Sequence, residues 1–247
     1  MKFDRAVVIS MRRRKDRLNA FYKSLCDSGW SHEEPVWFDA IDGGSGVVPC
    51  PNYWKSGGGA YGCQQSHIQV LQRALMDGVK SLLVFEDDAV FDPNFASSFE
   101  SLLQNAPVDW ECLMIGGQHM SAPVAVSDGI VKCVNTQRTH AYALYGDAIR
   151  DLCQLWQGSR NHIDWDMGPF FGKRGKTYAP EPFIVGQSAG RSDISGRDNP
   201  AKFWRPPQEG SPVVWLRCTR EVAEGLRAYG FHYGFRSEEH TSELQSR

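Results

Sequence analysis

Ser81-Leu82-Leu83-Val84-Phe85-Glu86-Asp87-Asp88 is an apolar run that ends abruptly in three carboxylates. Such a run is typical of a strand that is buried on both faces of a parallel sheet. Ligands of open α/β sheets bind outside the carboxyl ends of the strands. Clustered carboxylates repel one another unless a cation joins them, and they are the oxygen ligands that Mg²⁺ and Mn²⁺ accept beside phosphate. The stretch therefore predicts a metal–diphosphate site, although a solvated acidic turn would have the same sequence.

Strand and helix patterns alternate on both sides of this run. Strands are expected at 5–10, 36–41, 81–85 and 111–115, with helices at 16–28, 60–77 and after Asp92-Pro93, then strands at 130–134 and 140–145 and a helix at 147–156. Residues 43–59 and 186–212 are rich in Gly, Pro and Ser and are expected to be loops. The β-α-β-α-β order predicts an α/β fold with a mainly parallel central sheet flanked by helices.

The composition is that of an ordinary globular protein. The chain has 247 residues, 41% of them hydrophobic, and a formal net charge of −2, which gives no reason to expect nucleic acid as a partner. Its length fits one domain, assigned to residues 1–235. We expect no transmembrane segment and no signal peptide, and the seven scattered cysteines lack the CxxC pairs of structural zinc sites. These features favour a cytoplasmic, reducing environment.

The last twelve residues differ from the rest. Residues 236–247 have almost no apolar content and look like the in-frame translation of a sequencing-adapter oligonucleotide. We interpret them as a non-native tail and expect them to be unpacked and dispensable, because they lack the apolar side chains that would offset ordering entropy. A genuine polar tail is the alternative.

A basic run, Arg12-Arg13-Arg14-Lys15-Asp16-Arg17, directly follows the first expected strand. A loop that leaves the carboxyl end of one parallel strand faces the same crevice as the acids that leave another. Arginines in that position can clamp phosphates bidentately. A solvated basic loop, or a structural ion pair in the case of Arg17, would explain the same residues.

Several motifs, in this order, resemble those of glycosyltransferase family 25. They are Val8-Ile9-Ser10-Met11 with Arg13 and Arg17, Phe38-Asp39-Ala40-Ile41-Asp42-Gly43, Gly59 to His67, Glu86-Asp87-Asp88, Ile163-Asp164-Trp165, Tyr178 to Pro182 with Gln187, and Ser192-Asp193-Ile194. The chain departs from the family pattern at Ser10, where Asn is usual, and at Met11, where Leu is usual.

The resemblance implies a GT-A-type fold and a particular reaction. The family includes lipopolysaccharide glycosyltransferases, which act in lipopolysaccharide biosynthesis, and procollagen galactosyltransferases. Members are expected to move a sugar, often galactose from a UDP-sugar, to a hydroxyl of a glycan or protein, with a divalent metal and inversion at the anomeric carbon. The expected cofactor is therefore Mn²⁺ or Mg²⁺.

Site residues follow from the motifs and their chemistry. Glu86 and Asp88 have a D-x-D-like spacing and are assigned to the metal, with His162 and His232 as candidates for a third contact. Donor binding is assigned to Arg13, Arg17, Ser66, His67 and Asp87, although His67 also fits a core histidine. The general base is assigned to Asp164 or Asp166, with Asp193 as the next candidate. In an extended segment Asp164 and Asp166 would face the same way, and in a helix they would diverge.

Two other functions use similar residues. A non-catalytic carbohydrate-binding or scaffold protein on a decayed GT-A fold would have dispersed rather than convergent acids. A sugar nucleotidyltransferase would have a glycine-rich phosphate loop with a lysine after the first strand, whereas here that loop is rich in arginine and lacks glycine.

Overall fold

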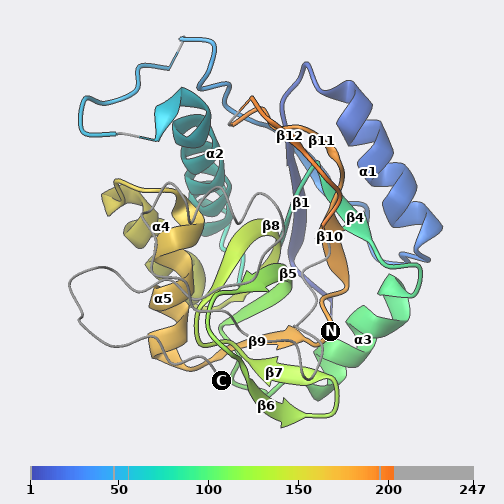
Figure 1. Ribbon diagram of the computed structural model, residues 1–247. Coiled ribbons are helices and arrows are strands. Elements are labelled where there is room, and N and C mark those ends of the chain that lie inside the picture. The colour runs from blue at the N-terminus through green and yellow to red at the C-terminus, as the bar shows by residue number, and fades with distance from the viewer. Residues whose placement is uncertain (1, 47, 55, 195, 203–247) are drawn as a thin grey trace, which may run out of the picture.

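The central sheet divides the molecule into two helical layers. The computed structural model describes residues 2–46, 48–54, 56–194 and 196–202, and in them an eight-stranded sheet has the order β2-β1-β3-β8-β5-β9-β7-β6 (Figure 1). Its strands are β1 (Arg5–Ser10), β2 (Val36–Asp39), β3 (Ser81–Glu86), β5 (Cys112–His119), β6 (Val124–Ser127), β7 (Ile130–Lys132), β8 (Thr136–Tyr145) and β9 (Thr177–Pro180).

Most strands of this sheet run in one direction. β1, β2, β3, β5, β6 and β9 are aligned, whereas β7 and β8 run against them. The α/β class and the mainly parallel sheet are thus confirmed. The antiparallel strand β8 lies between β3 and β5, so its first residues meet the carboxyl end of β3.

A hydrophobic core lies on each face of the sheet, and the apolar run of β3 contributes side chains to both. This is the burial on two faces that its sequence predicted. Leu82 and Val84 belong to one buried cluster, and Leu83 and Phe85 belong to the other. The first cluster includes side chains of α2 (Gly57–Met76), α4 (Ala148–Gly158) and α5 (Ile163–Arg174). The second includes side chains of α1 (Lys15–Asp27) and α3 (Phe95–Asn105), so the helices cover opposite faces of the sheet (Figure 1).

Two expected loops contain regular structure. Helix α2 begins at Gly57 rather than at Ala60, inside the glycine-rich stretch. The second expected loop begins within β10 (Val185–Gln187), which pairs with β4 (Ala89–Phe91). It continues into a hairpin of β11 (Gly190–Arg191) and β12 (Asp198–Asn199). Residues 203–247, which include the expected end of the domain, His232 and the tail, lie outside the described part of the chain.

Candidate functional site

A cavity of about 410 Å³ lies at the carboxyl ends of β1 and β3. Residues of α2, β8, α5 and the segment 187–202 complete its wall. Most of the predicted site residues line it, namely Arg17, Ser66, His67, Glu86, Asp87, Asp88, His162, Asp164 and Asp193. Arg13 and Asp166 are not among its lining residues. The structure therefore brings the acidic triplet, one arginine and one candidate base into a single space.

Glu86 is held in place by side chains of α2 and β8. The Thr139 hydroxyl donates to Glu86 Oε1 over 2.6 Å, and His67 Nε2 lies 3.3 Å from the same oxygen. Burial opposes ionisation of Glu86, but His67 and Thr139 together keep the pKa of its carboxyl below the usual value. Glu86 is thus a fixed, charged group on the wall of the cavity.

Asp87 joins the acidic triplet to the arginine loop, which is the basic run of residues 12–17 after β1 and includes the first turn of α1. The Ser10 hydroxyl donates to its Oδ2 over 2.7 Å, and Arg17 Nη1 lies 3.4 Å from Oδ1. Burial raises the pKa of the Asp87 carboxyl even though both neighbours favour its charged form. This carboxylate is therefore occupied by protein partners, and its assigned contact with the donor stays a prediction.

Asp88 has the arrangement expected of a ligand for a hard cation. The Gln187 amide donates to Oδ2 over 3.1 Å, whereas Oδ1 is buried and has no hydrogen-bond partner among the described residues. Burial and the charges of Glu86 and Asp87 raise the pKa of Asp88 to about 7. A buried carboxylate oxygen without a partner, beside two more acids, fits Mg²⁺ or Mn²⁺. Glu86 Oε1 is oriented toward the cavity by Thr139 and His67.

The two candidate bases lie on different sides of α5. The segment is helical, so Asp164 and Asp166 diverge. Asp164 lines the cavity, and its Oδ2 lies 3.2 Å from Arg138 Nη1. Asp166 accepts a hydrogen bond from the Ser159 hydroxyl instead. The geometry favours Asp164 as the base and gives Asp166 the role of fixing the start of the helix.

Arg138 is a site residue that the sequence analysis missed. It lines the cavity, contacts Asp164, and donates from Nη2 to Gln118 Oε1 over 2.7 Å. Its φ of 87° is in the left-handed region, at a place where the pairing of β5 with β8 shifts register. Such backbone strain occurs often at functional sites. The polar stretch 136–140 directly precedes the apolar residues of a buried strand, but this pattern does not single out Arg138.

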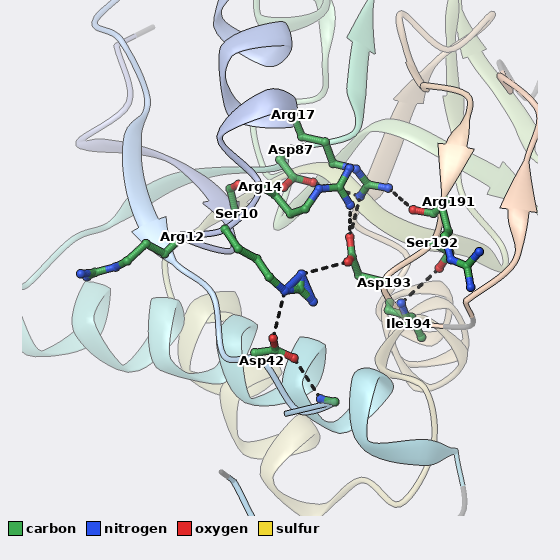
Figure 2. A network of polar contacts seen from close by, with 12 residues as sticks. Ser10, Arg12, Arg14, Arg17, Asp42, Asp87, Arg191, Ser192, Asp193 and Ile194 are labelled. Atoms are coloured by element: carbon green, nitrogen blue, oxygen red, sulfur yellow. Dashed lines mark hydrogen bonds and ion pairs between the residues drawn. The ribbon is translucent and has the colours of Figure 1, made fainter. Parts of the chain in front are cut away.

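The arginine loop meets the hairpin of β11 and β12 at one carboxylate (Figure 2). Arg13 Nη1 lies 3.1 Å and Arg17 Nη1 lies 3.5 Å from oxygens of Asp193, and Arg14 forms a third ion pair with it. Arg13 also contacts Asp42, and Arg12 turns away to Asp39. Since guanidinium groups engage both oxygens of Asp193, it is a weaker candidate for the base than Asp164.

The Gly59–His67 motif docks the start of α2 against the loop after β2. The Ser66 hydroxyl accepts from the Ile41 amide over 2.8 Å and donates to the Gly62 carbonyl over 2.7 Å. A Cβ on Gly62 would lie 2.4 Å from the Ile41 carbonyl oxygen, so only glycine allows this approach. Ser66 therefore positions the cavity wall, and its assigned donor contact stays a prediction.

Comparison with known proteins agrees with the motifs. Residues 3–123, just under half of the chain, match the sequence model of Glycosyltransferase family 25 (LPS biosynthesis protein). The chain is a relative of the family 25 glycosyltransferases. This match confirms the resemblance inferred from the motifs, and the matched residues contain the arginine loop, the Gly59–His67 motif and the acidic triplet.

The matches include two human relatives and one solved structure. Human Inactive glycosyltransferase 25 family member 3 is 30% identical over 164 residues, 58% of this chain and 27% of the relative. Human Procollagen galactosyltransferase 2 is 28% identical over 138 residues, 49% of this chain and 22% of the relative. The chain thus spans about a quarter of the length of these relatives. A glycosyltransferase involved in the glycosylation of the major capsid of PBCV-1 has a TM-score of 0.38 and 12% identity, over 72% of this chain and 82% of that one.

Among the described residues, every helix is too short or too polar to cross a lipid bilayer.

Proposed function

We propose that this protein is a metal-dependent, inverting glycosyltransferase that moves a sugar from a nucleotide-diphosphate donor to a hydroxyl of a glycan or protein. UDP-galactose is the first donor to test. One observation supports the proposal above all others. The unpartnered Asp88 oxygen, Arg17 and Asp164 belong to different elements of a family 25 relative and line the same cavity.

The roles follow from position and charge. Asp88 would hold Mn²⁺ or Mg²⁺ with help from Glu86, and the bound ion would stabilise the leaving diphosphate as a Lewis acid. Arg17, in the first turn of α1, would orient the diphosphate through paired N–H donors, and Arg13 would add charge behind it. These residues would fix the donor before the acceptor arrives.

Asp164 would take the proton of the attacking hydroxyl. Its carboxylate lines the cavity and is oriented by the Arg138 guanidinium at 3.2 Å. A general base must lie within hydrogen-bond reach of the proton that it removes, so its orientation matters as much as its basicity. Inversion then follows from direct displacement of the diphosphate by the activated hydroxyl.

The alternative of a non-catalytic sugar-binding protein has one specific observation in its favour, since a human relative is named inactive. The convergence of the acids on one cavity supports the enzyme. A nucleotidyltransferase is less well supported, because the loop after β1 is rich in arginine and contains no glycine.

The test is a donor-turnover screen across nucleotide sugars, with and without Mn²⁺. Asp88→Asn keeps the shape of the side chain but removes its charge, so it should abolish metal-stimulated release of the nucleoside diphosphate. Asp128→Asn, in an exposed turn, is the matched control and should behave as wild type. Wild-type turnover by a folded Asp88→Asn variant in Mn²⁺ would refute the assignment of Asp88, and no turnover of any donor by wild type would favour the binding protein.

A further inference from the structure

Three side chains of different chemistry meet where α2 packs against the end of β3. One potential ligand atom from each of Cys63, His67 and Glu86 lies within 4.8 Å of the other two. Cys63 and His67 are four residues apart on α2 and so project from the same face of the helix. All three residues line the cavity, which gives an ion a path to them.

The imidazole of His67 is arranged as it is in metal-binding histidines. The side chain is fully buried, and its Nδ1 lies 2.9 Å from the Tyr142 hydroxyl. Its Nε2 lies 3.3 Å from Glu86 Oε1, and in the described part of the chain this contact does not meet the geometry of a hydrogen bond. Metal ligands commonly have one ring nitrogen oriented by a partner while the other binds the ion.

Glu86 is oriented in the same way. The Thr139 hydroxyl fixes its Oε1 at 2.6 Å, and that oxygen lies 3.3 Å from His67 Nε2. A buried polar atom without a hydrogen bond, such as His67 Nε2, is energetically costly. Such atoms are rare in native structures unless an ion or a water satisfies them. His67 Nε2 and the Glu86 carboxylate are therefore both held in place near Cys63.

We propose that Cys63, His67 and Glu86 bind a divalent transition-metal ion that accepts sulfur, of the Zn²⁺ or Co²⁺ class. Sulfur and imidazole ligands select such ions, whereas oxygen ligands like Asp88 select Mg²⁺ or Mn²⁺. Three protein ligands beside an open cavity leave a fourth position free, as in catalytic rather than structural zinc sites. This inference does not depend on the proposed sugar transfer, although Glu86 borders both this group and the Asp88 site.

The charges balance when the ion binds. The Cys63 thiol loses its proton to solvent as its sulfur binds the ion, because a thiolate is the ligand form. The thiolate and the Glu86 carboxylate together neutralise a divalent charge, and His67 binds as a neutral ring. Burial raises the pKa of the free Cys63 thiol well above its usual range.

The test uses Co²⁺ as a spectroscopic probe of the full-length, reduced protein under anaerobic conditions. We expect a thiolate-to-cobalt charge-transfer band that saturates at one equivalent and is removed by Zn²⁺ but not by Mg²⁺. Cys63→Ser should lose the band, whereas Cys26→Ser, which changes an exposed cysteine of α1, should keep it. Tyr142→Phe should keep the band and weaken Co²⁺ binding by about 10–100-fold.

A second measurement needs no substitution. Zn²⁺ should slow alkylation of Cys63 in the wild-type protein, measured on its peptide by mass spectrometry, and leave alkylation of Cys26 unchanged. Asp88→Asn should retain the cobalt band, which separates this site from the oxygen-ligand site. The absence of a thiolate band in wild type, an equal band in Cys63→Ser, or alkylation of Cys63 that Zn²⁺ does not slow would overturn the proposal.

Discussion

Asp164 and Asp166 differ by two positions on α5, yet only Asp164 lines the cavity. We expect Asp164→Asn to lower the transfer rate by a factor of about 10²–10⁴, since the hydroxyl proton loses its acceptor. Binding of the nucleoside diphosphate should change little. Asp166→Asn should leave transfer near wild type and cost about 1 kcal/mol of unfolding free energy through its bond to Ser159.

Transfer kinetics, calorimetric UDP binding and urea denaturation of both variants check this assignment. Near-normal transfer by folded Asp164→Asn would place the base elsewhere, with Asp193 as the next residue to test. Equal losses of transfer rate in both variants would show that the fold of α5, rather than the Asp164 carboxylate, is what transfer requires.

The sequence located some site residues and missed others for physical reasons. The Glu86–Asp88 acids and Arg17 could be placed because parallel strands bring their carboxyl ends to one edge. Choosing between Asp164 and Asp166 required knowing that the segment is helical, and its sequence fits either state. Arg138 could not be placed, because its position depends on a register shift and a positive φ that no pattern of polar and apolar residues indicates.

The first turns of α2 approach other backbone closely at Gly58, Gly59 and Gly62. We expect Gly62→Ala to destabilise the protein by about 1–3 kcal/mol, although alanine favours helices, because its Cβ would lie 2.4 Å from the Ile41 carbonyl oxygen. Gly158→Ala, at the end of α4, is the matched control, since a Cβ there meets nothing within 4 Å. Urea denaturation should show a loss only for Gly62→Ala.

The hairpin of β11 and β12 is held to the arginine loop by polar contacts. Asp193 pairs with Arg13, Arg14 and Arg17, and Arg17 also donates to the Arg191 carbonyl. We expect Asp193→Asn to weaken this attachment and to speed tryptic cleavage after Arg191 and Arg197. Asp198→Asn, an exposed acid of the same hairpin, should leave the rate unchanged. Equal cleavage rates for wild type and Asp193→Asn would mean that other contacts hold the hairpin.

The same hairpin shows why local patterns failed at the level of elements. Residues 186–212 were expected to lack structure because they are rich in Gly, Pro, Ser and Arg. Its described part, residues 186–194 and 196–202, is instead fixed by partners up to 180 positions away, such as the Arg13–Asp193 pair, and by pairing of β10 with β4. Apolar periodicity carries no information about ion pairs of that kind.

Contacts across the sheet give the whole molecule a dependence on pH. Asp4, just before β1, accepts hydrogen bonds from the Lys80 and Ser81 amides, which lower the pKa of its carboxyl. A lowered folded-state pKa adds stability above the unfolded value of about 3.9, and this stability disappears as pH falls through the folded value. Asp4→Asn should therefore lower the unfolding free energy at pH 7, and the difference should shrink near pH 2.5.

Urea denaturation of wild type and Asp4→Asn at both pH values checks this expectation. Asp128→Asn, in an exposed turn, is the control and should show little difference at either pH. A gap between Asp4→Asn and wild type that stays constant from pH 7 to pH 2.5 would contradict the linkage.

At the scale of the molecule, strand direction was easier to predict than strand order. The alternation of strands and helices indicated a mainly parallel sheet, and the apolar run of β3 indicated burial on both faces. The insertion of β8 between β3 and β5 could not be predicted from the sequence, because it depends on pairings between distant segments, such as Phe85 with Ala141.

The three arginines around Asp193 have a consequence for ionic strength. A donor diphosphate that binds there must displace the Asp193 carboxylate from the three guanidinium groups. The ion pairs that it forms therefore replace existing ones, and the number of ion pairs changes little. Because salt screens both sets of pairs, UDP affinity of wild type should vary little between about 50 and 500 mM NaCl. In Asp193→Asn the guanidinium groups lose this partner, so UDP should bind more tightly at low salt and its affinity should fall steeply as salt rises. Calorimetric titrations at both salt concentrations would separate the two behaviours, and parallel salt dependence in the two proteins would mean that the diphosphate and Asp193 do not compete.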